Sequence, residues 1–65
     1  MQIKEYPPLA DVRLVQEITT LSRSTVYKLV NEGTFPAPRK LISTRVAWVT
    51  ADVLAWVDRK MGAAV

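Results

Sequence analysis

The sequence predicts a small α+β domain, mostly helical, with three short helices and a two-stranded β-hairpin. Three observations carry this prediction. Residues 12–19 and 22–32 each show helical spacing of apolar side chains and are separated by a very short turn. Residues 39–49 follow two prolines and include a stretch in which polar and apolar residues alternate. Residues 51–60 form a third amphipathic segment behind a threonine.

The composition indicates one small globular domain that favours an anionic partner. The chain has 65 residues, of which 49% are hydrophobic, and its net charge is +3. The absence of cysteine and histidine removes the usual thiolate and imidazole ligands and nucleophiles, so no metal or other cofactor is expected. No apolar run approaches the ~20 residues of a membrane span, and no leader pattern follows Met1, so we expect a cytoplasmic protein without a membrane partner.

Residues 1–10 are predicted to be a flexible arm, residues 11–61 the folded domain and residues 62–65 a tail. Pro7 and Pro8 exclude helix and favour an extended path. The arm either packs loosely over the domain or reaches a partner through Lys4 and Tyr6, and a frayed terminus is favoured because termini are commonly poorly ordered.

The first predicted helix, residues 12–19, begins after Asp11, a good N-cap. The turn Thr19-Thr20-Leu21 leaves room only for a tight connection before Ser22 starts the next helix. Two helices joined by about three residues, the second more basic, match the helix-turn-helix pattern.

The second helix runs from Ser22 to a stop at Gly33, which adopts the left-handed conformation readily. One side carries the apolar residues Leu21, Val26, Leu29 and Val30 and should face a core. The other positions carry Arg23, Ser24, Thr25, Tyr27, Lys28 and Asn31, which could enter a DNA groove. The alternatives are an ordinary solvated face and, for Tyr27 and Thr25, a role in packing.

Residues 39–42 and 45–49 are predicted to form the hairpin, with Ser43-Thr44 at its tip and Phe35 anchoring the path before it. The alternation in the second strand predicts Arg45 out, Val46 in, Ala47 out and Trp48 in. Leu41, Val46 and Trp48 would then attach the hairpin to the body.

The third helix, residues 51–60, is predicted to be capped by Thr50 and ended by Gly62. Its apolar stripe holds Val53, Trp56, Val57 and Met61. Both tryptophans, Trp48 and Trp56, lie within apolar stripes, which favours core positions over base-stacking platforms.

The sequence does not favour a catalytic function, because the carboxylates are not paired at helical spacing and the two glycines are too far apart for a phosphate loop.

Nucleic-acid binding is better supported. The second helix and the hairpin residues Arg39, Lys40 and Arg45 could grip double-stranded DNA together. These cations could instead protect a short strand edge from pairing. The rival function is a protein-interaction module that docks a larger protein without touching DNA; the resemblance described next implies an integrase or a larger regulator as that partner.

Several motifs in order resemble the AlpA-like family of phage and prophage regulators. They are Leu21-Ser22-Arg23-Ser24-Thr25-Val26-Tyr27, then Gly33-Thr34-Phe35-Pro36-Ala37-Pro38, then Arg45-Val46-Ala47-Trp48 and Val53-Leu54-Ala55-Trp56-Val57. The family looks like winged helix-turn-helix domains of the MerR type, acting as transcription regulators or as excisionases that bind beside an integrase and bend DNA.

The resemblance implies two groups of DNA contacts. The recognition helix would contribute Ser22, Arg23, Ser24, Thr25, Tyr27 and Lys28, and the wing Arg39, Lys40, Ser43, Thr44 and Arg45. It also implies that further copies of the chain bind neighbouring sites. Two positions depart from the family pattern, which usually has glycine where this chain has Thr20 and in the wing where it has Ile42-Ser43. Thr20 must therefore adopt an unusual backbone angle, or the turn must differ.

Overall fold

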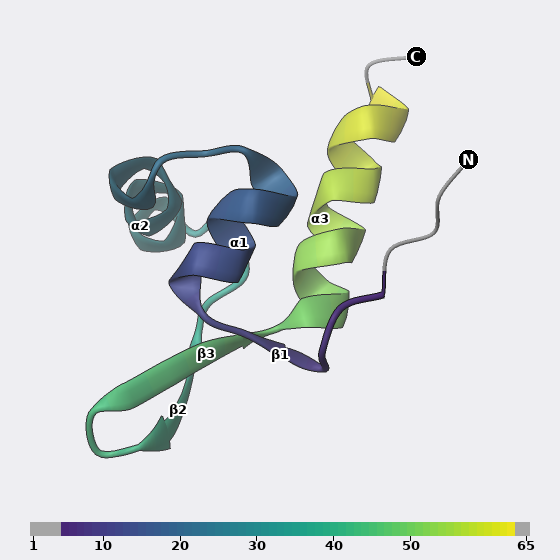
Figure 1. Cartoon of the computed structure of the whole chain (residues 1–65). Helices are drawn as coiled ribbons and strands as arrows, with labels where there is room; N and C mark the ends of the chain where they lie inside the picture. The colour runs from purple at the N-terminus through teal and green to yellow at the C-terminus, as the bar shows by residue number, and fades with distance from the viewer. Residues whose placement is uncertain (1–4, 64–65) are drawn as a thin grey trace.

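The computed structural model describes residues 5–63 and has the predicted mixed α+β architecture (Figure 1). Its elements are β1 Leu9–Ala10, α1 Val12–Thr19, α2 Arg23–Glu32, β2 Arg39–Ile42, β3 Arg45–Val49 and α3 Thr50–Ala63. Three helices and a three-stranded antiparallel sheet confirm a mostly helical fold that is compatible with a winged helix. Lys4, proposed above as an arm contact, and tail residues 64–65 lie outside the described residues.

The strand order β1-β3-β2 makes β3 the link between the body and the hairpin. The carboxyl end of β3 pairs with β1, in the register Leu9↔Val49 and Ala10↔Trp48. Its amino end pairs with β2, beginning with Arg39↔Ala47. The β2–β3 hairpin therefore extends away from the helices as a wing (Figure 1). The predicted flexible arm is wrong for Leu9 and Ala10, because their backbone is paired with β3.

The core takes one buried side chain from almost every element, namely Ala10, Val15, Val26, Phe35, Trp48 and Val53. They come from β1, α1, α2, the connection after α2, β3 and α3 in turn. The exception is β2, all four residues of which are exposed. The wing is therefore held to the body through β3 rather than through side chains of β2.

Both tryptophans serve the core and fix the connection between α2 and β2, as their positions in apolar stripes predict. The indole N–H of Trp48 donates to the carbonyl of Pro36 at 2.8 Å, and that of Trp56 donates to the carbonyl of Thr34 at 2.7 Å. The Phe35 ring lies 4.8 Å from the Trp56 ring, edge to face, so the predicted anchor is confirmed. These contacts set the point from which the wing departs.

The predicted helix ends are confirmed at α1 and α2. An Asp11 carboxylate oxygen accepts the backbone N–H of Leu14 at 2.9 Å, and the Ser22 hydroxyl accepts that of Thr25 at 3.2 Å. Gly33 ends α2 with a φ of 79°, and Thr20 ends α1 with a φ of 63°. Of the two alternatives for Thr20, an unusual backbone angle or a different turn, the structure shows the unusual, left-handed angle.

The predicted inward and outward faces of the wing are wrong at three positions. Leu41 and Val46 are exposed, whereas Ala47 is buried. An extra residue at Leu41 interrupts the β2–β3 register between Lys40↔Val46 and Ile42↔Arg45. This bulge, together with the projection of the hairpin beyond the helices, leaves the distal apolar side chains without a body to pack against.

The third helix differs from its prediction at both ends. Thr50 is its first residue rather than its cap, and the Thr50 backbone N–H donates to the carbonyl of Pro8 at 2.9 Å, which continues the β1–β3 pairing. Gly62 does not end the helix, which continues to Ala63, since one glycine costs a helix only ~1 kcal/mol. Met61, expected in the buried stripe, is 67% exposed. Within residues 5–63 there is no helix of sufficient length and apolarity to cross a membrane.

Candidate nucleic-acid interface

The first turn of α2 presents an arginine on an aromatic support. The guanidinium of Arg23 lies 5.8 Å from the centroid of the Tyr27 ring, a cation–π distance. The same ring also lies beside Trp48, whose ring centroid is 5.8 Å away. Tyr27 is therefore half-buried between an exposed arginine and the fully buried tryptophan of β3. This stacking orients Arg23 relative to the rest of the domain.

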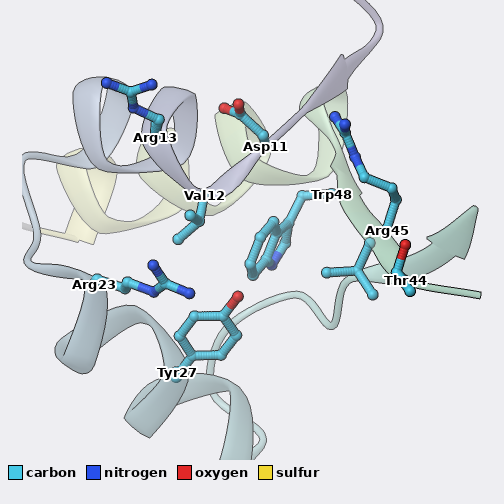
Figure 2. A pocket seen from close by; sticks show the side chains of 9 residues that line it. Asp11, Val12, Arg13, Arg23, Tyr27, Thr44, Arg45 and Trp48 are labelled. Carbon is cyan, nitrogen blue, oxygen red and sulfur yellow. The ribbon is translucent and has the colours of Figure 1, made fainter.

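A groove of about 350 Å³ lies beside this stack, between the amino ends of α1 and α2 and the wing. Figure 2 shows the Tyr27 hydroxyl and the Arg23 side chain directed into it, with Arg45 on the opposite side. The lining residues are Asp11, Val12, Arg13, Arg23, Tyr27, Thr44, Arg45, Val46 and Trp48. Helix and wing thus share one surface.

The charge of this groove is positive. Arg13, Arg23 and Arg45 contribute three guanidinium groups, against the single carboxylate of Asp11. That carboxylate is occupied as the N-cap of α1. The amino end of α2 adds backbone N–H groups that are suited to a phosphate. The surface therefore suits a polyanion that spans the helix and the wing.

The structure brings together four of the predicted contacts, Arg23, Tyr27, Thr44 and Arg45, as lining of the groove. Six others are exposed on the same elements or on the wing turn without lining it: Ser22, Ser24, Lys28, Arg39, Lys40 and Ser43. The remaining one, Thr25, is half-buried. The Ser22 hydroxyl donates to the Thr25 hydroxyl at 2.8 Å while capping α2, so both of these side chains already have intramolecular partners.

Arg13 is the cation at this groove that the sequence did not single out. On the helical pattern of residues 12–19 it is one more outward-facing polar residue. Its position at the groove follows from the packing of α1 against α2 and β3, which no local motif encodes. Figure 2 shows the Arg13 side chain at the rim, directed away from the Tyr27 ring.

A second groove, away from the surface formed by α2 and the wing, also contains a cation beside an aromatic ring. This groove, of about 370 Å³, lies between α1 and α3 and is lined by Ile18, Thr19, Thr20, Trp56, Val57, Lys60 and Met61. Lys60 lies 5.5 Å from the Trp56 ring centroid there. It is an exposed cation that stacks on an aromatic ring, as Arg23 does, but outside the surface formed by α2 and the wing.

Comparison with known proteins places the chain in a phage family. The family model described as "Prophage CP4-57 regulatory protein (AlpA)" matches residues 11–61. The chain is also 42% identical, over 43 residues, to the uncharacterized protein ORF88 of Enterobacteria phage P4. That match covers 66% of this chain and 49% of the relative, so the chain spans about half the length of the curated protein it matches. No solved structure matches. With its family model covering the helices, the wing and nearly all of α3, the chain belongs to the AlpA family of phage and prophage regulatory proteins.

Proposed function

We propose that the chain binds double-stranded DNA sequence-specifically and acts as an excisionase, as a transcription regulator or as both. The observation that carries the proposal is the groove that Arg23, stacked on Tyr27, and Arg45 of the wing line together. Membership of a regulatory phage family implies a DNA-binding regulator and agrees with it. The protein would work at the nucleoid, in the cytoplasm of a bacterial host.

In this mechanism α2 enters the major groove with its first turn, and the wing lies over the adjacent backbone and minor groove. Arg13, Lys28, Arg39, Lys40 and Arg45 neutralise phosphates, which supplies most of the affinity. Arg23, Ser24 and the Tyr27 hydroxyl face the base edges. Ser43 and Thr44 at the wing turn add short hydrogen bonds to the backbone. No group of the protein reacts with the DNA.

Several copies would bind neighbouring sites and bend the DNA, since one domain of 65 residues contacts few base pairs. Bound beside an integrase, such an array would direct excision; bound at a promoter, it would control transcription. A gene for an integrase next to this one would favour the first role, and a divergent promoter would favour the second.

The test compares Arg23→Ala with Lys60→Ala in gel shifts on attachment-site and promoter DNA of the host prophage. Arg23→Ala should weaken specific binding about tenfold or more, the value of a good base contact. Lys60→Ala removes an equal charge, also stacked on an aromatic ring, from the far side of the molecule and should change binding less than about threefold. Equal effects of the two substitutions would mean that DNA does not bind at the surface formed by α2 and the wing.

An interaction module that docks an integrase would give a different pair of results. The wild-type chain would shift none of these DNA fragments, and its pull-down of the partner would survive nuclease treatment.

A further inference from the structure

The tip of the wing exposes apolar side chains among cations. Ile42 is 64% exposed, Leu41 50% and Val46 42%. Arg39 and Lys40 precede Leu41 on β2, and Arg45 follows the turn. Residues 33–51 contain no aspartate or glutamate. An exposed apolar tip within an exclusively basic segment has the charge of a DNA-binding surface rather than that of an ordinary protein contact.

The bulge at Leu41 determines which apolar side chain lies opposite Arg45. Lys40 pairs with Val46, and an uninterrupted register would then pair Leu41 with Arg45. Instead Ile42 is the cross-strand partner of Arg45, with only Ser43 and Thr44 between them. An aliphatic group and a guanidinium therefore stand side by side at the tip of the wing.

This tip is placed to meet the DNA held by α2. Thr44, Arg45 and Val46 line the same groove as Arg23 and Tyr27, so a duplex that follows this groove also passes the wing tip (Figure 2). When a helix occupies a major groove, an extension at its side reaches the adjacent minor groove. Apolar side chains that enter a minor groove wedge between base pairs and kink the duplex by about 20–90°.

We propose that Ile42 is a wedge that inserts between two base pairs from the minor groove and kinks the DNA, while Arg45 holds the flanking phosphate. The inference rests on the proposed function and names the residue responsible for bending. The kink falls at pyrimidine–purine steps, because these unstack most easily. Leu41 and Val46 cover the sugars on either side of the step.

The experiment uses a 30-bp duplex, a length of about three helical turns, selected by the wild-type chain from a random pool. Dyes at its two ends report the bend by energy transfer, and 2-aminopurine beside each pyrimidine–purine step reports unstacking. The wild-type chain should bend the duplex by at least about 20° and raise the 2-aminopurine fluorescence at one step. Ile42→Thr, which keeps the β-branch that strands prefer, should lose both signals while retaining the salt dependence of binding.

Two further variants serve as controls. Ile42→Met keeps an apolar side chain of the kind found in DNA wedges and should retain the kink. Met61→Thr removes an equally exposed apolar side chain, 67% against 64%, from α3 and should behave as the wild type does. Circular dichroism of all variants checks that the fold is unchanged.

Three results would overturn the wedge. The first is a kink that persists in Ile42→Thr, and the second is a wild-type complex on straight, fully stacked DNA. The third is self-association of the free chain that Ile42→Thr abolishes, without any effect on the bend, which would make the tip a contact between copies. If no duplex is selected at all, the proposed function itself fails, and that outcome is distinct from all three.

Discussion

At the scale of single residues, the side-chain hydroxyl of Thr50 is buried without a hydrogen-bond partner within residues 5–63. The residue is 2% exposed. Its backbone N–H is used in the pairing with Pro8. Leaving a buried hydroxyl unsatisfied costs about 1–3 kcal/mol.

Thr50→Val should therefore stabilise the protein. Valine has the same shape and keeps the backbone bond to Pro8, so the free energy of unfolding should rise by about 1 kcal/mol and Tm by roughly 4–8 °C. Thermal denaturation followed by circular dichroism measures the change. Thr44→Val at the exposed wing turn is the control and should leave Tm nearly unchanged. A lower Tm for Thr50→Val would mean that the hydroxyl does have a partner.

At the scale of elements, two helices end on a residue in the left-handed backbone conformation. One of these residues, glycine, adopts that conformation without strain, and the other, threonine, does not. Thr20 ends α1 at a φ of 63°, and Gly33 ends α2 at a φ of 79°. A side chain in this conformation costs about 1–2 kcal/mol, whereas glycine adopts it freely. A Cβ at Gly33 would meet no atom within 4 Å, so a substitution there tests the backbone alone.

Exchanging these residue types should change stability in opposite directions. Thr20→Gly should raise the free energy of unfolding by roughly 0.5–1 kcal/mol, because the relief of strain exceeds the added entropy of the unfolded chain. Gly33→Ala should lower it by about 1 kcal/mol. Urea titrations monitored by tryptophan fluorescence measure both. Changes of the same sign would contradict the conformation assigned to one of the two turns.

The elements show which features of the fold are local. The helix starts at Asp11 and Ser22 are predictable because each cap is a local hydrogen bond between residues three apart in the sequence. The strand Leu9–Ala10 cannot be predicted in this way, because two residues show no periodicity. Their pairing partner, Trp48–Val49, lies about forty residues further along the chain. No sequence pattern marks the bulge at Leu41 either. The prediction of which wing residues face inward fails because this bulge changes the register of the two strands.

The residues of the candidate interface also divide into those that a local sequence pattern predicts and those that only tertiary packing reveals. Arg23, Tyr27 and Arg45 could be predicted because each belongs to an element with a readable pattern. Arg13 could not, since only the packing of α1 beside α2 brings it to the groove.

At the scale of the whole molecule, the cations are unevenly distributed. The helix α2 and the wing carry five, against the single carboxylate of Glu32, and Arg13 at the start of α1 adds a sixth; the five are Arg23, Lys28, Arg39, Lys40 and Arg45. The helix α3 carries Arg59 and Lys60 beside Asp52 and Asp58, so it has no net charge. A DNA duplex should therefore meet one face of the molecule.

If five or six phosphates are neutralised, the logarithm of the affinity should fall with the logarithm of salt concentration at a slope of roughly −4.5 to −5.5. Arg13→Ala should make this slope shallower by about 1, because one phosphate contact is lost. Arg59→Ala removes the same charge from α3 and should leave the slope unchanged. Fluorescence anisotropy at several salt concentrations measures it. A slope near zero would exclude phosphate-driven binding.

The strand β2 places all its side chains in solvent and gives none to the core. Its four residues are consequently under little selection for folding. If the wing contacts DNA as proposed, substitutions within β2 would change the DNA preference one residue at a time while leaving the core side chains in place. The same freedom makes residues 39–42 the natural place to graft a new DNA preference onto this small domain.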